Sequence, residues 1–246
     1  MDFDLDLSDN YMGTKFGRIH YKRHGGSGAS VIFIHGFGGS LRTWKRLVEF
    51  MPMEINIYLI DLLGHGESDA PGIEYSLDVH LDVLSEVIRK AGPRPCLFGH
   101  SYGGWIAAAY AQKNGGLGGL VLEDSAGFDA SIEDAGKRDP GYKDKLYEEA
   151  IRMNPREHVV RSSITSMRTD ERLTRKSLGV IAIPALVVWG SRDEIISLKY
   201  GRAIAESVPG STIKIIEGAG HVPHYTNPGE VSGILLNFLG HSIHVL

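Results

Sequence analysis

The sequence is poor in three features that often assign a protein to a large class: cysteine, long hydrophobic runs and excess positive charge. Its 246 residues include a single cysteine, Cys96, so no intrachain disulfide can form, and we expect a small buried core residue there. No apolar run approaches the roughly 20 residues that span a bilayer. The formal net charge of −4 offers no footprint for nucleic acid or for an anionic membrane surface.

Motifs for cofactors and metal ions are missing as well. There is no Walker A pattern, and the glycines at 36–39 do not form Gly-x-Gly-x-x-Gly. No cluster of cysteine and histidine has zinc spacing, because His221 and His224 alone are too sparse. We therefore expect no cofactor and no metal. The acidic segment Met1–Asp6 lacks the basic and apolar regions of a secretory signal, so we expect a cytoplasmic protein, as a monomer or homodimer.

Short apolar strands alternate with helical segments along most of the chain. Strands are predicted at 18–22, 31–34, 55–60, 95–98, 117–122, 185–189 and 212–216. Helices are predicted at 41–50, 76–90, 102–113, 196–206 and 227–239. Uninterrupted apolar strands separated by helices are typical of a mostly parallel sheet with helices on both faces. The predicted fold class is therefore α/β, with a core formed by residues 1–124 and 180–246.

The alternation stops in the middle of the chain, at residues 125–179. This segment is rich in interspersed charges and has few apolar runs. Its apolar residues could bury one face of a helical structure; they are Leu146, Ile151, Val159, Val160, Ile164 and Leu173. We therefore predict a helical insertion rather than a solvated linker or a nucleic-acid patch.

The pattern Gly-x-Ser-x-Gly occurs at Gly99, Ser101 and Gly103, between a predicted strand and an alanine-rich helix. In that setting the serine lies on a sharp turn that exposes its hydroxyl at the edge of the sheet. Glycines are expected on both sides because the backbones of strand and helix approach closely there. The alternative is a tight turn with a buried serine. We predict that Ser101 is a nucleophile.

A serine hydroxyl needs a base to take its proton and a carboxylate to orient that base. His221 follows the strand 212–216, and Asp193 follows the strand 185–189, so both are expected at the sheet edge where parallel sheets hold their active sites. We predict His221 as base and Asp193 as acid. Asp124 is the reserve acid, and His224 is expected to face the last helix.

An acyl-transfer intermediate also needs hydrogen-bond donors for its negative oxygen. The backbone N–H of Tyr102 lies at a helix start, where the helix dipole favours negative charge. The second donor is predicted to be the N–H of Phe37, in the glycine-rich loop 35–39. The ring of His35 is expected to hold this loop by hydrogen bonds to the backbone.

Five segments together resemble the α/β-hydrolase-fold superfamily, in its serine-nucleophile branch of carboxylesterases, enol-lactone hydrolases and carbon–carbon bond hydrolases. They are 35–39 (HGFGG), 61–68 (DLLGHGES), 99–104 (GHSYGG), 189–193 (WGSRD) and 218–221 (GAGH). They occur in the family's order across residues 18–240. The resemblance implies a small helical cap at 125–179 and a structural role for 61–68. Relatives that remove halide or open epoxides carry aspartate where this chain has Ser101.

The predicted function is hydrolysis of a small-molecule carboxylic ester through an acyl-enzyme, with Ser101, His221 and Asp193 as triad. Three alternatives stay open. A carbon–carbon bond hydrolase would need a polar pocket for an extended keto-acid. An aminopeptidase would hold a free amino group with cap carboxylates, for which Glu133, Asp134, Glu148 and Glu149 are available. A ligand receptor of this fold could keep the triad without useful turnover.

Overall fold

The computed structural model describes residues 7–242 of the chain. The expectation about Met1–Asp6 concerns residues outside this part. Among residues 7–242, no helix is long and apolar enough to cross a membrane.

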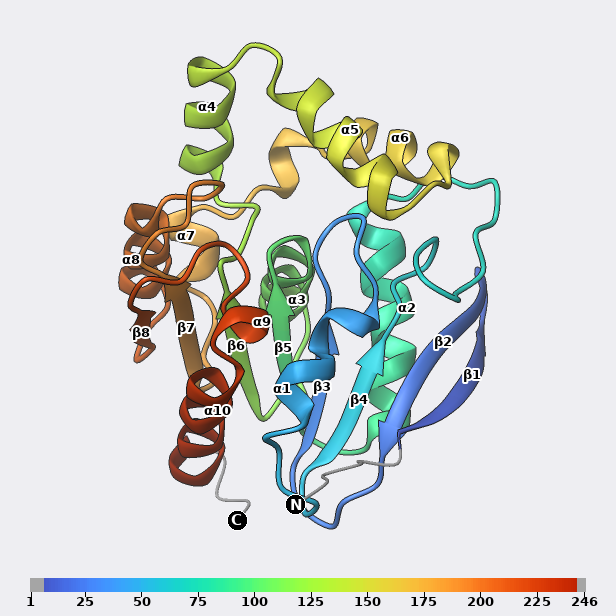
Figure 1. Ribbon diagram of the computed structural model, residues 1–246, viewed down its shortest axis with the longest axis vertical. Coiled ribbons are helices and arrows are strands. Elements are labelled where there is room, and N and C mark those ends of the chain that lie inside the picture. The colour runs from blue at the N-terminus through green and yellow to red at the C-terminus, as the bar shows by residue number, and fades with distance from the viewer. Residues whose placement is uncertain (1–6, 243–246) are drawn as a thin grey trace.

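Within residues 7–242, eight strands form one sheet in the order β1-β2-β4-β3-β5-β6-β7-β8 (Figure 1). The strands are β1 (Ser8–Thr14), β2 (Gly17–His24), β3 (Ser30–Ile34), β4 (Asn56–Ile60), β5 (Cys96–His100), β6 (Gly119–Glu123), β7 (Ala185–Gly190) and β8 (Thr212–Ile216). Pairing is antiparallel for β1–β2 and β2–β4 and parallel for the other pairs. The central strands β4, β5, β6 and β7 are buried along their whole length, which explains their unbroken apolar sequences.

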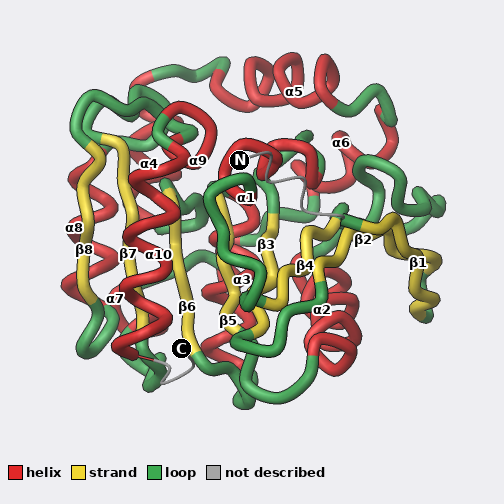
Figure 2. The backbone as a smooth tube through the Cα atoms, turned by 60° about the horizontal axis from the view of Figure 1, so that its bottom comes forward, coloured by secondary structure: helices red, strands yellow, loops and turns green. Residues whose placement is uncertain are grey.

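Helices cover both faces of the sheet (Figures 1 and 2). One layer contains α2 (Leu77–Ala91), α3 (Tyr102–Lys113), α7 (Arg175–Leu178) and α8 (Leu198–Ser207). The other contains η1 (Leu41–Trp44), α1 (Lys45–Val48), α9 (Pro223–Thr226) and α10 (Pro228–Ser242). This arrangement confirms the predicted α/β class.

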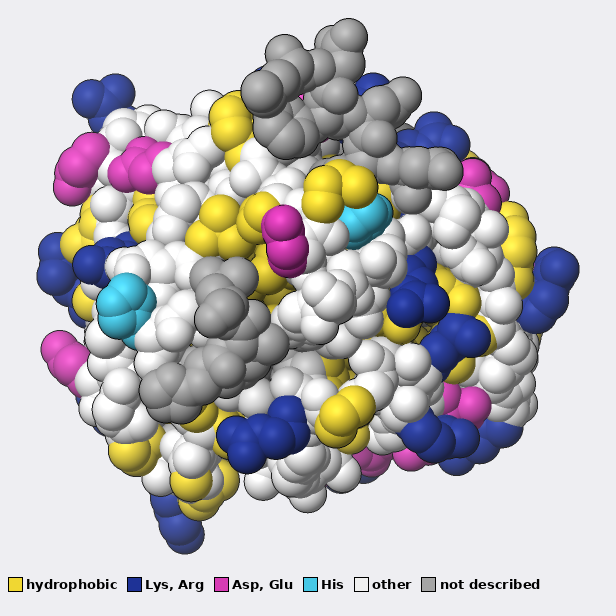
Figure 3. Space-filling view, turned by 90° about the horizontal axis from the view of Figure 1, so that it is seen from below, with side chains coloured by type: hydrophobic (Ala, Val, Ile, Leu, Met, Phe, Trp, Pro, Cys, Tyr) yellow, Lys and Arg dark blue, Asp and Glu magenta, His cyan; other side chains and the backbone are white. Residues whose placement is uncertain are grey.

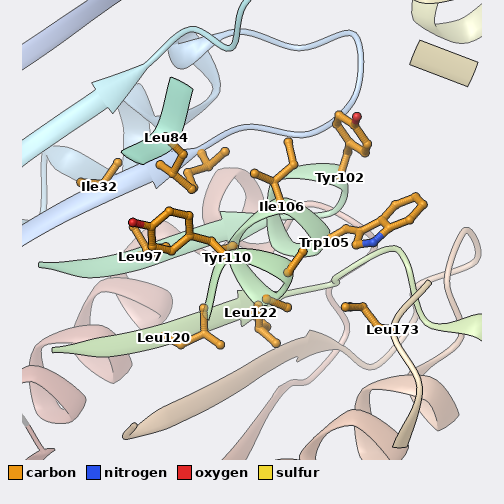
Figure 4. Packing of buried hydrophobic residues seen from close by; sticks show 14 of the residues in the cluster. Ile32, Leu84, Leu97, Tyr102, Trp105, Ile106, Tyr110, Leu120, Leu122 and Leu173 are labelled. Atoms are coloured by element: carbon orange, nitrogen blue, oxygen red, sulfur yellow. The ribbon is translucent and has the colours of Figure 1, made fainter. Parts of the chain in front are cut away.

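Each layer encloses its own apolar core. On the α2/α3 side, Ile106 and Tyr110 of α3 lie among Leu84 of α2 and the strand residues Leu97 and Leu120 (Figure 4). On the opposite side, α1 and α10 pack on alternate residues of the same strands. The buried single cysteine, Cys96, belongs to this second core, as expected. The two cores fix the sheet between helices and thereby fix the positions of its strand ends.

The structure corrects the element predictions in three places. Strand β1 was not predicted, because its residues are mostly exposed and carry little apolar signal. The single helix predicted at 41–50 is a 3₁₀ turn followed by one short α-helix. The short helix α9 was also not predicted, because the sequence pattern indicated only a loop before the last helix.

Three helices of the middle segment lie beyond the carboxyl ends of the central strands (Figure 1). They are α4 (Asp129–Arg138), α5 (Tyr142–Met153) and α6 (Glu157–Thr165), followed by η2 (Thr169–Glu171). Val159 and Val160 of α6 are fully buried, which anchors this helix to the rest of the chain. The face at the other end of the sheet shows hydrophobic side chains interspersed with charged ones (Figure 3). The division into core and cap stays a prediction.

Candidate active site

Ser101 lies on a strained turn between β5 and α3. Its φ of 51° and ψ of −115° fall outside the regions that L-residues usually adopt. A Cβ added to Gly103 would lie 2.2 Å from the carbonyl oxygen of Ile34, and one on Gly99 would lie 2.3 Å from that of Gly103. Only glycine allows these backbones to approach so closely. The elbow therefore requires the Gly-x-Ser-x-Gly pattern for steric reasons.

The structure brings Ser101, His221 and Asp193 together. Nε2 of His221 is 3.0 Å from Oγ of Ser101, and Nδ1 of His221 is 2.8 Å from Oδ2 of Asp193. Ser101 follows β5, Asp193 follows β7 and His221 follows β8, so all three come from carboxyl ends of parallel strands. Parallel pairing aligns these ends at one edge of the sheet, although 120 positions separate Ser101 from His221.

Asp193 is held as an ionised carboxylate. Its Oδ1 accepts hydrogen bonds from the backbone N–H groups of Ile195 and Ile196, at 2.8 and 2.9 Å. Burial opposes ionisation, but the hydrogen bond from His221 and these backbone donors outweigh it and lower the pKa of Asp193. An ionised Asp193 fixes the proton of His221 on Nδ1, which leaves Nε2 free to accept the proton of Ser101.

Two backbone N–H groups near Ser101 are placed to act as oxyanion donors. Within the described chain, no hydrogen bond uses the N–H of Phe37 or of Tyr102. The loop that carries Phe37 lies against the elbow, since a Cβ on Gly36 would be 3.3 Å from Cβ of Ser101. The rings of Phe37 and Tyr102 have centroids 5.6 Å apart. Unpaired donors on both sides of a nucleophile can stabilise an oxyanion.

The loops beside the elbow are held by buried polar side chains. Nδ1 of His35 donates to the carbonyl of Gly36 at 2.8 Å, and its Nε2 accepts from the N–H of Leu62 at 3.1 Å. This is the backbone role expected for His35. Asp61 accepts from the N–H groups of Leu41 and Glu67, at 2.7 and 2.9 Å, and so ties its own loop, 61–68, to the end of the loop after β3.

Comparison with known proteins identifies the family of this chain. Residues 31–234 match the alpha/beta hydrolase family. This chain belongs to the alpha/beta hydrolase family. The chain is 27% identical to Lipase 1 of Psychrobacter immobilis, over 89% of this chain and 80% of that protein.

Solved structures share the fold across nearly the whole chain. A thermophilic esterase from Thermogutta terrifontis superimposes with a TM-score of 0.78 at 23% identity, covering 96% of this chain and 99% of that one. An esterase from Exiguobacterium antarcticum superimposes with a TM-score of 0.76 at 21% identity, covering 95% of this chain and 100% of that one.

This alpha/beta hydrolase also contains a buried network that the sequence did not reveal. Glu123, at the end of β6, accepts a hydrogen bond from the backbone N–H of His224 at 3.0 Å, and its other oxygen bonds with Nδ1 of His224. His224 therefore faces the sheet, and the expectation that it faces the last helix is wrong. Its Nε2 is 2.7 Å from the hydroxyl of Thr43. His100 donates to the carbonyl of His221 at 2.7 Å.

Burial controls the protonation of this network. It raises the pKa of Glu123 to about 7 and lowers the pKa of His224 to about 3. Burial and the neighbouring rings of His224 and His221 lower the pKa of His100 to about 3. A strand-end glutamate next to Asp124 was the only available sequence signal. Its partner could not be identified, because it lies 101 positions away.

Within the described residues of this hydrolase, two clusters have the donor types that bind metal ions. His100, Glu123 and His224 bring donor atoms within 4.8 Å of one another, and so do Asp124, Asp193 and His221. In each cluster, however, a carboxylate bonds to a histidine of the same cluster. We interpret both as hydrogen-bond networks and assign a metal to neither.

A cavity of about 990 Å³ lies beside the loop after β3 and contains none of the triad residues in its lining. Its lining includes the residues His20, Arg42 and Arg156. A much narrower pocket lies next to the elbow, beneath α6, and has no room for a water molecule. Tyr102 and Trp105 of α3 and Ser163 of α6 contribute to it. The space adjoining the elbow is thus formed jointly by the elbow helix and the middle segment.

Proposed function

We propose that this alpha/beta hydrolase cleaves carboxylic esters through Ser101, His221 and Asp193. The observation that carries the proposal is the continuous path from Oγ of Ser101 through the ring of His221 to Oδ2 of Asp193, with steps of 3.0 and 2.8 Å. Both distances are within hydrogen-bond range, so His221 can take the proton of Ser101 directly while Asp193 orients the ring. The lipase and esterase names among the similar proteins point to the same class of bond.

In the first half of the reaction, Oγ of Ser101 attacks the ester carbonyl while its proton passes to Nε2 of His221. Asp193 stabilises the imidazolium that forms but keeps its own negative charge. Negative charge develops on the carbonyl oxygen, where the N–H groups of Phe37 and Tyr102 can bind it. His221 then gives its proton to the leaving alcohol, and the acyl group remains on Ser101.

In the second half, His221 takes a proton from a water molecule, whose oxygen attacks the acyl-enzyme. The same two N–H groups stabilise the second tetrahedral intermediate. Its collapse releases the acid and returns the proton to Oγ of Ser101. No step needs a cofactor or metal ion. We propose a small-molecule ester substrate and a monomeric or homodimeric enzyme of the cytoplasm.

The test uses a fluorophosphonate probe and p-nitrophenyl butyrate. We expect one probe molecule per chain, attached to Ser101, and steady turnover of the ester that Ser101→Ala abolishes. Full activity in Ser101→Ala would overturn the proposal. Labelling without turnover of any ester would favour a ligand receptor instead.

The aminopeptidase alternative gains no support from the middle segment. Three of its four carboxylates proposed for amine binding are exposed; these are Glu133, Glu148 and Glu149. The fourth, Asp134, bonds to Lys199 and to the hydroxyl of Tyr200. Comparing an amino-acyl p-nitroanilide with the p-nitrophenyl ester tests this point directly, and we expect much faster cleavage of the ester.

A further inference from the structure

A second carboxyl group lies behind the triad and has no part in the mechanism above. Asp124 follows β6 directly and is fully buried. Its Oδ1 accepts a hydrogen bond from the backbone N–H of Gly190 at 3.0 Å. Within residues 7–242, its Oδ2 has no hydrogen-bond partner. A buried carboxyl oxygen without a partner is costly, so it calls for an explanation.

The neighbours of Asp124 supply one. A carboxyl oxygen of Asp124, one of Asp193 and a ring nitrogen of His221 lie within 4.8 Å of one another. If both carboxyls were ionised, neither could donate a hydrogen bond, and two negative charges would share one buried site. A proton on Asp124 removes the repulsion and creates a donor beside an acceptor.

We propose that Asp124 is a positioning residue of the triad: a carboxylic acid that stays protonated at neutral pH and donates a hydrogen bond to Asp193. The inference rests on the proposed function, because it assigns Asp124 to the support of Asp193. It differs from the role of reserve acid, in which an ionised Asp124 would orient His221 itself.

The charges around Asp124 agree with this assignment. The titratable groups that face it are Glu123 on its own strand, Asp193 after β7 and His221 after β8. Burial, followed by the proximity of Glu123 and Asp193, raises the pKa of Asp124 well above its usual range. The pKa of Asp193 is lowered instead. Two carboxyls whose environments move their pKa values in opposite directions have different roles.

The backbone of Asp124 links the ends of two strands. Its N–H donates to the carbonyl of Val188 at 3.1 Å, while its side chain accepts from the N–H of Gly190, so two hydrogen bonds hold the end of β7 to the end of β6. Asp193 lies only three residues after Gly190. The φ of Asp124 is 42°, a conformation that asparagine and glycine also tolerate. These two residues therefore provide substitutions that do not strain the backbone.

The variants Asp124→Asn and Asp124→Gly distinguish two roles for residue 124: a neutral hydrogen-bond donor and an ionised carboxylate. An asparagine amide can donate to Asp193 while its oxygen accepts from Gly190, so we expect kcat within about threefold of the unmodified enzyme. Glycine removes both bonds, and we expect kcat to fall about tenfold or more with KM nearly unchanged, because Asp193 loses its fixed position. If the asparagine variant were as impaired as the glycine variant, an ionised carboxylate would be required and the proposal would be wrong.

A second measurement does not depend on catalysis. In protein labelled with ¹³C at aspartate carboxyls, Asp124→Asn identifies the signal of Asp124 by its disappearance. We expect that signal to have the chemical shift of a protonated carboxyl at pH 7. An ordinary titration near pH 4 would overturn the proposal. Failure of the proposed function would show differently, as unlabelled Ser101 and absent turnover in the unmodified protein.

Discussion

Glu123 binds the backbone N–H of His224 with one carboxyl oxygen and Nδ1 of the same residue with the other. Both side chains are fully buried, and His224 lies only three residues after His221. The pair therefore attaches the segment after β8 to the end of β6. His100 holds the same segment through the carbonyl of His221. The position of the proposed base is thus fixed by a contact at its own backbone carbonyl and by contacts three residues after it.

Replacing Glu123 with alanine should destabilise the protein. The change leaves two buried donors of His224 without acceptors, and we expect the free energy of unfolding to fall by about 3 kcal/mol. Urea denaturation at pH 7 measures it. The exposed Glu217 provides the control, since Glu217→Ala should leave stability nearly unchanged. Equal stability of the two variants would contradict a structural role for the pair.

Replacing Asp193 with asparagine should reduce kcat by about 10⁴ while KM changes little. The amide can no longer accept the proton of His221 on Nδ1 in the same way, and the ring adopts the wrong tautomer. Steady-state kinetics with p-nitrophenyl butyrate measure this loss. The neighbouring exposed Glu194 is the matched control, because Glu194→Gln should retain full activity. A loss of similar size in the control would show that Asp193 was wrongly chosen.

Two glycine-to-alanine changes should have opposite effects on stability. A Cβ on Gly103 would meet backbone oxygen at 2.2 Å, and we expect a loss of about 3 kcal/mol or failure to fold. Gly233 lies within α10 with no atom within 4 Å of its added Cβ. There alanine should stabilise the helix by about 1 kcal/mol. Thermal denaturation measures the stability of both variants. A Gly103→Ala variant as stable as the unmodified protein would contradict the close approach of the backbones at the elbow.

Stability should fall as the pH decreases below 6.5. Burial lowers the pKa of five histidines: His35, His65, His80, His100 and His224. In the unfolded chain they titrate near pH 6.5, so below that pH the unfolded state binds more protons than the folded state. Each such proton contributes up to about 1.4 kcal/mol per pH unit.

The raised pKa values of Glu123, Asp124 and His20 oppose this trend, because the folded state binds their protons more tightly than the unfolded state. The five histidines with lowered pKa values outnumber these groups, so we expect the urea midpoint to decrease as the pH falls from 6.5 to 5. A urea midpoint that stays constant or rises as the pH falls from 6.5 to 5 would show that these five histidines are not buried in neutral form.

Much of the fold was accessible from local patterns. Unbroken apolar runs such as 185–189 predicted buried parallel strands, and the glycines around Ser101 indicated an elbow whose steric reason the structure supplies. Where local signals were weak, prediction failed. Strand β1 is mostly exposed, and the helical pattern at 41–50 did not reveal the change from a 3₁₀ turn to an α-helix.

By itself, the sequence determined the α/β class, the order Ser101, Asp193, His221 along the chain, and the location of each at a strand end. Tertiary structure alone decided which strands are neighbours, and therefore that these three ends lie within hydrogen-bond distance. It also decided the partners of Glu123, His224 and Asp124. Their buried polar atoms must pair with whatever the fold places beside them, and no local pattern encodes a partner that lies tens of residues away.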